Sequence, residues 1–162
     1  MREKIARPER VRRVRGDIPV RHRYTPGVAG EAFFAALRDR GVLLGSRCES
    51  CDYTYVPARL FCERCFAELG ADAEVGPGGE LVSFTIGFVD ADGGALDLPE
   101  TLGLVRLDGA DALLVHRILD PGDEPLEIGE RVEAVVRPPE QRSGSILDLE
   151  GFRLAEGEPD AG

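Results

Sequence analysis

The sequence predicts a mainly β protein in two parts, a helix with a small cysteine-rich ribbon followed by a five-stranded barrel. Three observations predict this fold class. All four cysteines fall between residues 48 and 65, as two Cys-x-x-Cys pairs. Segments in which apolar and polar residues alternate, the pattern of half-buried strands, follow from about residue 80 to residue 154. No convincing long helical pattern lies among them, so the strands are expected to close on themselves.

Composition narrows the classes of protein that need to be considered. The chain has 162 residues, of which 43% are hydrophobic and 31% charged, an ordinary globular composition. No apolar run is long enough to span a bilayer. The first residues carry charges without an apolar core behind them, so we expect no secretory signal and a cytoplasmic protein.

Charge is distributed unevenly along the chain. Residues 1–27 form a predicted basic arm, in which residues 1–23 carry nine basic groups and a net charge of +6. Because the whole chain carries −10, the remaining residues carry −16. So acidic a body repels phosphate backbones, which argues against broad nucleic-acid binding. The arm itself has two interpretations, a solvated tail or a segment that grips an acidic partner or RNA.

The first predicted element is a helix over residues 30–40. Alanine and leucine favour a helix there, and Gly41 supplies a C-terminal stop. Phe33, Phe34 and Leu37 form one apolar stripe, which three helical turns cannot bury by themselves. We expect the stripe to pack on the ribbon and barrel, and the alternative is a helix face that contacts a partner protein.

The two Cys-x-x-Cys pairs are the strongest signal in the sequence. Each pair lets a tight turn aim two sulfurs at one point, and two such turns supply the four thiolates of a closed tetrahedral zinc site. Iron in a rubredoxin-like centre uses the same ligands and stays an alternative. Disulfides and a redox dithiol are disfavoured by the missing signal peptide and the doubled motif. We predict one structural zinc ion per chain, held by Cys48, Cys51, Cys62 and Cys65.

The ten residues between the two pairs are expected to form a short hairpin. Residues 53–56 are its predicted first strand, Pro57 the break and Leu60-Phe61 the return. Helix and ribbon together are predicted to span residues 28–75, and the ribbon is too small to fold on a hydrophobic core alone. Zinc binding, which contributes on the order of 10 kcal/mol in small metal-dependent modules, would replace the missing core.

The barrel is predicted over residues 76–155, after a Gly-Pro-Gly-Gly turn. In its first strand the apolar residues Val82, Phe84, Ile86 and Phe88 alternate with small or polar ones, which predicts one buried face. Five strands in about 75 residues indicate a small closed barrel, of which the OB-fold is the best-known five-stranded example. The other four strands are expected at residues 102–107, 112–119, 132–136 and 146–154, and residues 156–162 are expected to form a flexible tail.

The sequence contains no recognisable set of catalytic residues. His22 lies in the basic arm, and His116 lies on a strand, where we expect a partly buried side chain with one hydrogen-bond partner. The carboxylates are scattered through turns, and the glycine cluster at residues 76–79 enters a strand rather than a helix, so it is not a phosphate loop. A four-sulfur site also leaves its metal no open position. We therefore predict a protein that is not an enzyme.

The order of these parts resembles a known family, the small zinc-ribbon plus OB-fold proteins associated with acyl-CoA metabolism. The resemblance covers residues 28–154 and rests on the Phe33-Phe34 helix, the cysteine pairs, the trailing barrel and the stretch from Tyr55 through Pro57 and Arg59 into Phe61-Cys62. Family members often carry two prolines before the arginine, whereas the second position here is Ala58.

The resemblance implies an accessory role. Such proteins bind thiolases, thiolase-like aldolases, hydroxymethylglutaryl-CoA synthase or enoyl-CoA hydratase partners, and stabilise them or help shape the passage for an acyl-CoA. We accordingly expect a non-catalytic subunit of a thiolase-like acyl-CoA enzyme that helps to position or channel acyl-CoA. Two alternatives stay open: a nucleic-acid-binding OB-fold module, and a stand-alone acyl-CoA-binding or hydratase-related protein.

Zinc is expected to fix the ribbon as a docking surface that presents Tyr53, Tyr55 and Phe61, because aromatic residues and arginines dominate interface energies. The nearby arginines could contact the partner or a CoA phosphate. Their alternative role is in surface ion pairs with Glu49, Asp52 and Glu63, worth under about 1 kcal/mol each. The arginines concerned are Arg47, Arg59 and Arg64.

Overall fold

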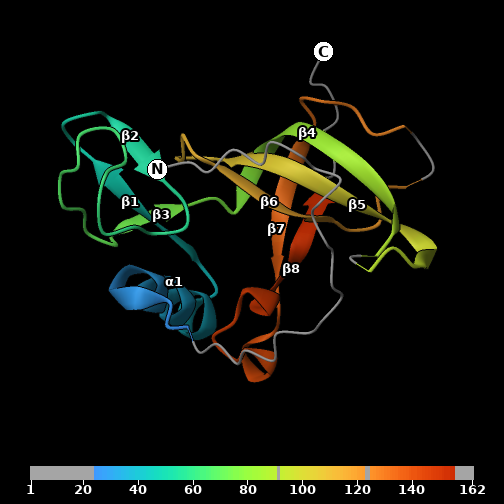
Figure 1. Cartoon of the computed structure of the whole chain (residues 1–162), viewed down its shortest axis with the longest axis horizontal. Helices are drawn as coiled ribbons and strands as arrows, with labels where there is room; N and C mark the ends of the chain where they lie inside the picture. The colour runs from blue at the N-terminus through green and yellow to red at the C-terminus, as the bar shows by residue number, and fades with distance from the viewer. Residues whose placement is uncertain (1–23, 91, 123–124, 156–162) are drawn as a thin grey trace, which may run out of the picture.

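The computed structural model describes residues 24–90, 92–122 and 125–155 (Figure 1). It confirms the predicted fold class, mainly β with one α-helix, a ribbon sheet and a closed barrel. The predicted basic segment 1–23 and the tail 156–162 lie outside the described residues. The elements are α1 (Gly27–Arg40), β1 (Leu43–Cys48), β2 (Tyr53–Tyr55), β3 (Ala73–Val75), β4 (Gly78–Val89), β5 (Ala95–Leu107), β6 (Leu113–Ile118), β7 (Arg131–Val136), η2 (Pro139–Gln141), η3 (Ile146–Asp148) and β8 (Leu149–Leu154).

Helix α1 begins at Gly27, three residues before the predicted start, and ends as predicted at Gly41. Gly41 adopts a left-handed conformation with φ of 71°, and its N–H donates to the carbonyls of Ala36 and Leu37. Phe33 and Leu37 are buried in the core, and Phe34 is half-buried against it. The partner-facing alternative is therefore wrong for Phe33 and Leu37, because the chain's own core covers them. Within the described residues, no helix has the length and hydropathy that crossing a bilayer requires.

The ribbon sheet has the strand order β2-β1-β3. Strand β2 pairs with β1, with Tyr53 opposite Cys48, so the first cysteine pair forms the turn of this hairpin. The predicted return strand at Leu60-Phe61 is wrong, since Phe61 forms only an isolated bridge with Glu68. Strand β1 escaped prediction because five of its six residues are buried, which removes the alternation that marks a strand.

The barrel is closed and has five strands, as the sequence predicts, and their order is β4-β5-β6-β8-β7. Neighbouring strands are antiparallel except β6 and β8, which run parallel and pair only at Ile118 and Phe152. The start of the fifth predicted strand is wrong, because residues 146–148 form the 3-10 helix η3. Gly151 sits where β6 and β8 close together, and a Cβ there would meet the Arg117 carbonyl at 2.8 Å.

The helix, the barrel and part of the ribbon share one hydrophobic core, whereas Cys48, Tyr55, Cys62 and Leu69 form a second cluster at the cysteine end of the ribbon. Phe33 of α1 and Leu43 of β1 belong to the same buried cluster as Leu81, Val105 and Phe152 of the barrel. Strand β3 ends at Val75 and β4 begins at Gly78, so little chain separates the two predicted parts. The two predicted parts therefore pack against each other, although the turn at residues 76–79 predicts a boundary between them.

The predicted buried face of β4 is only partly correct. Val82 and Phe84 are half-buried, whereas Ile86 and Phe88 have 47% and 64% of their surface exposed, and the fully buried residue is Leu81, outside the predicted face. The pairing of β4 with β5 shifts register between Leu81 and Ser83, which moves the buried position. Beyond that point β4 also runs past the barrel, where nothing among the described residues covers its apolar side chains fully.

Candidate metal centre

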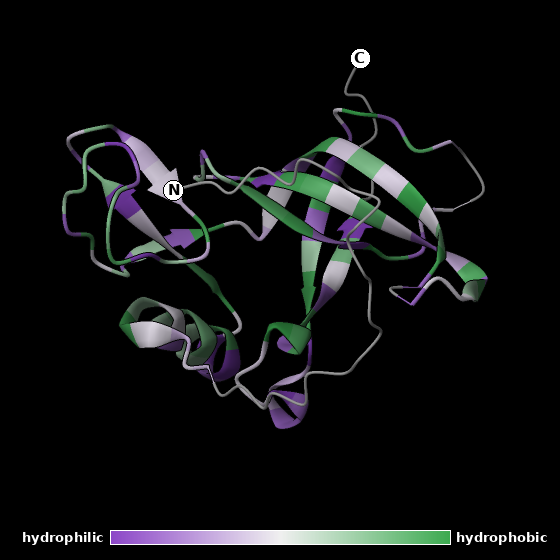
Figure 2. Ribbon diagram, viewed as in Figure 1, coloured by the Kyte–Doolittle hydropathy of each residue, from purple (hydrophilic) through white to green (hydrophobic). Residues whose placement is uncertain are grey.

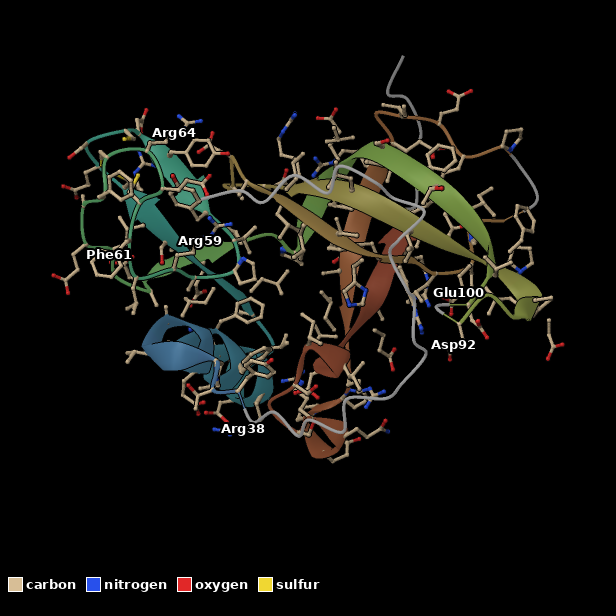
Figure 3. All side chains as sticks on the ribbon, viewed as in Figure 1. Arg38, Arg59, Phe61, Arg64, Asp92 and Glu100 are labelled. Carbon is tan, nitrogen blue, oxygen red and sulfur yellow. The ribbon has the colours of Figure 1, made fainter. Side chains whose placement is uncertain are left out.

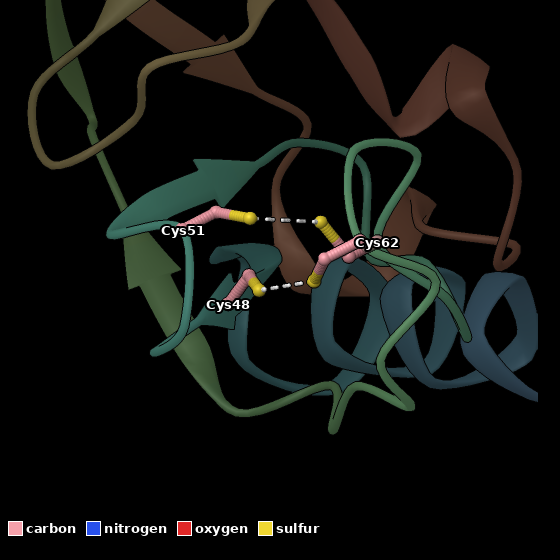
Figure 4. Close-up of side chains that lie close together, drawn as sticks. Cys48, Cys51 and Cys62 are labelled. Atoms are coloured by element: carbon pink, nitrogen blue, oxygen red, sulfur yellow. Dashed lines mark hydrogen bonds between the residues drawn. The ribbon is translucent and has the colours of Figure 1, made fainter.

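The four cysteines converge from two turns. The first pair lies in the turn that joins β1 to β2, and the second in the segment that follows β2. Their four Sγ atoms lie within 4.8 Å of one another. The Sγ atoms of Cys48 and Cys65 are 3.6 Å apart, and those of Cys62 and Cys51 are 3.8 Å apart (Figure 4).

This spacing fits a tetrahedral metal ion. A zinc–sulfur bond of about 2.3 Å places the sulfurs of a tetrahedron about 3.8 Å apart. No disulfide joins the cysteines, and their Sγ atoms are too far apart for a sulfur–sulfur bond, which is about 2.05 Å long. Four thiolates fill a tetrahedral shell, so an ion held here has no position left for substrate or water and serves structure.

The Sγ atom of Cys62 contacts hydrogen-bonding groups outside the cysteine cluster. Its Sγ lies 3.3 Å from the Tyr55 hydroxyl and accepts the Arg64 backbone N–H at 3.4 Å. The Tyr55 hydrogen bond is the main cause that lowers the pKa of Cys62 to about 6, against the opposing effect of burial. Tyr55 is fully buried, so its expected role as a surface contact is wrong; it supports the metal ligand instead.

The pKa values of two other thiols indicate that the four thiolates need a cation between them. Hydrogen bonding with the neighbouring Cys65 thiol, together with burial, raises the pKa of Cys51 to about 12, and burial is the main cause that raises the pKa of Cys48. Packed this closely, four thiolates would repel one another, and a divalent cation at their centre removes that repulsion.

The predicted arginines have different partners. Arg47 pairs with Asp52, and Arg59 donates to Glu63 at 2.6 Å, so for these two the surface ion-pair alternative is confirmed. The guanidinium of Arg64 instead stacks on the ring of Tyr53, 3.8 Å from its centroid. Among the described residues, no carboxylate lies within ion-pair distance of Arg64.

Exposed apolar side chains surround the second cysteine pair. Phe61 is 57% exposed, as the docking hypothesis requires, and is labelled with Arg59 and Arg64 in Figure 3. Sequence analysis missed Phe66, which is 77% exposed. Its position directly after Cys65 is the signal that could have found it, because a side chain next to a ligand in a short turn has little core to enter.

His116 differs from its prediction. It is partly buried as expected, but its Nδ1 atom is buried without any hydrogen-bond partner. It borders a groove of about 490 Å³ that Leu102, Leu119 and Leu149 also line. Burial, and secondly the charge of Arg117, lower its pKa. Glu150 also lines the groove and pairs with Arg137, and among the described residues no carboxylate or nucleophile is hydrogen-bonded to His116.

Comparison with known proteins decides the family. Residues 35–69 match the rubredoxin-like zinc ribbon domain of ChsH2, and residues 72–137 match its C-terminal OB-fold domain. The chain belongs to the zinc-ribbon plus OB-fold family. The resemblance drawn from the sequence is thus confirmed, and so is the OB-fold assignment of the barrel. A search of curated proteins found no match.

Two solved structures have the same fold as this ChsH2-like chain. One is a protein of unknown function from the DUF35 family of Sulfolobus solfataricus, 26% identical, with a TM-score of 0.57, over 79% of this chain and 84% of that one. The other is a chain described as the Ltp2-ChsH2(DUF35) aldolase, 20% identical, with a TM-score of 0.53, over 76% of this chain and 93% of that one.

Proposed function

We propose that this chain is a non-catalytic accessory subunit that binds a thiolase-like acyl-CoA enzyme. The observation that carries the proposal is a four-sulfur centre without an open coordination position, on a chain whose described residues hold no catalytic constellation. The proposal draws further support from the shared fold with a chain of the Ltp2-ChsH2(DUF35) aldolase. We infer that the reaction belongs to the partner enzyme and that this chain supports it.

We propose zinc as the ion at the four cysteines, one per chain. The family whose ribbon model matches is described as a zinc ribbon, and four thiolates are a common zinc ligand set. Bound zinc would hold the two turns together and fix the exposed residues around them. In this way it would give the partner a rigid docking surface and lower the entropy that binding costs.

On the ribbon, we propose Phe61 and Arg64 as the residues that contact the partner. Phe61 offers an exposed ring, and Arg64 offers a guanidinium that no carboxylate neutralises among the described residues. Aromatic rings and arginines are enriched among residues that dominate binding energy. Arg47 and Arg59 are less suited to a CoA phosphate or partner, since each already pairs with a carboxylate.

Nucleic-acid binding by the barrel is the second candidate, and charge argues against it. Single-strand binding by OB-folds relies on a positively charged groove with exposed aromatic rings. In the described part of the barrel, five arginines lie 3.9 Å or less from a carboxylate, which neutralises them: Arg106, Arg117, Arg131, Arg137 and Arg153.

Co-purification tests the proposed function. The tagged chain is expressed in its native host and recovered, and the proteins that elute with it are identified by mass spectrometry. We expect a thiolase-like acyl-CoA enzyme in near-stoichiometric amount. Cys62→Ser should recover little of it, whereas Ser50→Ala, in the same ribbon but with all four sulfurs kept, should recover as much as the wild type. A chain that always elutes alone would contradict the proposal, and tight, salt-sensitive binding of single-stranded RNA would favour the second candidate.

A further inference from the structure

Strands β4 and β5 extend well beyond the barrel. They have 12 and 13 residues, whereas β6, β7 and β8 have six each. β4 pairs with β7 only at residues 78–80, and β5 pairs with β6 only at residues 101–106. Residues 86–100, the β4–β5 arm, are thus a two-stranded hairpin with no third strand, at the end of the molecule opposite the ribbon (Figure 1).

This arm exposes four large apolar side chains, two of which, Ile86 and Phe88, lie on the face that the sequence pattern predicts to be buried. Ile86, Phe88, Val89 and Leu98, together the arm patch, are 47%, 64%, 60% and 78% exposed. Figure 2 shows the hydrophobic bands continuing along both strands into the outer half of the hairpin. Large exposed apolar patches mark interaction sites, and these four side chains lie on one projecting hairpin.

Hydrogen bonds at the tip hold the arm in one shape. The Asp90 carboxylate accepts the N–H of Asp92 at 2.9 Å and that of Gly94 at 2.7 Å. The Asp90 N–H donates to the Gly94 carbonyl at 2.8 Å, which closes the turn. An isolated hairpin is only marginally stable, so these bonds help to present the arm patch in a fixed geometry and reduce the ordering cost of binding.

The tip is also acidic. Asp90, Asp92 and Asp97 form no ion pair among the described residues, whereas Glu100, at the base of the arm, lies 3.2 Å from Arg117. Asp92 and Glu100 are labelled in Figure 3. The arm therefore combines an apolar surface with uncompensated negative charge, and a surface that covers it favourably is apolar with a basic rim.

We propose that the arm patch is a docking surface for the partner enzyme, which covers it with an apolar groove edged by lysine or arginine. This inference rests on the proposed function and adds a second contact at the far end of the molecule from Phe61. A second copy of this chain is a poorer occupant. A symmetric contact between two arms would place two acidic segments in one interface, and like charges oppose such an interface.

Affinity measurements with matched variants test the arm patch. The enzyme that co-purifies is isolated, and its binding to the chain is measured by calorimetry for the wild type, Phe88→Ser, Val89→Ser and Val115→Ser. Val115 is the matched control, a strand valine outside the arm that is 61% exposed against 60% for Val89. We expect Phe88→Ser and Val89→Ser to weaken binding by about tenfold or more, and Val115→Ser by less than about twofold. Asp92→Lys should slow association and reduce its dependence on salt.

The outcomes separate this inference from the proposed function. If the wild type binds the enzyme and all four proteins bind it equally, the arm patch is wrong while the accessory role stands. If the wild type recovers no acyl-CoA enzyme, the proposed function fails and the inference fails with it. A free chain that sediments as a dimer, and as a monomer after Phe88→Ser, would assign the patch to a second copy. A further outcome concerns amide hydrogen exchange in the free chain. If the amides of the β4–β5 arm are protected in the wild type and lose this protection in the double variant Arg12→Glu/Arg13→Glu, the basic segment 1–23 covers the arm patch.

Discussion

At the scale of the residue, the hydroxyl group of Tyr55 supports the metal centre through its contact with Cys62. Tyr55 lies buried under the centre and directs its hydroxyl to the Sγ of Cys62. Groups that hydrogen-bond to metal ligands orient them and tune their affinity, although they touch no metal themselves. Tyr53, two residues earlier, is only half-buried and carries the guanidinium of Arg64 on its ring.

Tyr55→Phe should therefore weaken zinc binding while the ribbon keeps its packing. Removing a supporting hydrogen bond typically costs about 10- to 100-fold in metal affinity. The measurement is zinc competition with a chromogenic chelator, and Tyr53→Phe is the matched control, which removes the same atom two residues away. Equal zinc affinities for the two variants would show that the Tyr55 hydroxyl does not support the centre.

The cysteine ligands could be predicted from sequence because their spacing alone requires a common point. The role of Tyr55 could not, because the bond from its hydroxyl to Cys62 joins side chains whose relative direction depends on the β1–β2 hairpin. The same limit applies to His116. The strand of His116 and the face it lies on could be predicted. The lack of a hydrogen-bond partner for its Nδ1 atom could not, because it depends on which side chains line the groove.

The connection from β7 to β8 shows how one buried carboxylate shapes an element. Asp148 is fully buried and accepts the backbone N–H groups of Ser143, Gly144 and Ser145. Burial opposes its charge, but these hydrogen bonds outweigh burial and lower the pKa of Asp148. The loop that it orders lies next to α1, where Arg142 links the carbonyls of Arg137 and Arg38.

The lowered pKa gives the fold a defined response to acid. A carboxyl group with a lower pKa in the folded state stabilises the fold above its unfolded value of about 3.9, and this contribution is lost as pH falls through the folded pKa. Asp148→Asn should destabilise the protein by about 2 kcal/mol at pH 7, and the difference should shrink below about pH 4. Urea unfolding across pH 3–7 measures it, with exposed Asp97→Asn as the control. A constant difference at every pH would contradict this account.

At the scale of the strand, alternation in the sequence predicts where strands lie more reliably than which of their residues are buried. The barrel strands overlap their predicted places because a period of two is the pattern of a half-covered sheet, but β5 begins at Ala95, well before the predicted start at residue 102. The exposure of Ile86 and Phe88 was not predictable, because alternation shows which residues share a face and not whether the fold is long enough to cover it. Alternation does not predict strand β1, because this strand is covered on both faces and its residues do not alternate.

Across the whole molecule, the shared core predicts that helix, ribbon and barrel unfold as one cooperative unit. The predicted boundary near Gly76 treats them as separate modules, whereas Leu37 of α1 and Leu81 of the barrel belong to one buried cluster. Arg40 of α1 also pairs with Glu74 of β3, so charge as well as packing ties the helix to the ribbon.

Leu37→Ala should destabilise the entire chain rather than the helix alone. A fully buried leucine leaves a cavity that costs about 3 kcal/mol when it is cut back to alanine. Calorimetry of the zinc-loaded protein should show a single transition that moves to lower temperature without splitting. Val28→Ala, on the exposed start of the same helix, should leave the transition almost unchanged. Two separate transitions would show that ribbon and barrel unfold independently.

The most direct measurement of the central claim compares acyl-CoA thioester turnover by three samples. These are the zinc-loaded chain alone, its co-purified enzyme alone, and the two together. We expect no turnover by the chain alone, because four sulfurs close its metal site and, among its described residues, no carboxylate or nucleophile is hydrogen-bonded to His116. We expect the highest or most stable activity in the third sample. Turnover by the chain alone, or an enzyme whose activity and stability are the same with and without it, would contradict the account.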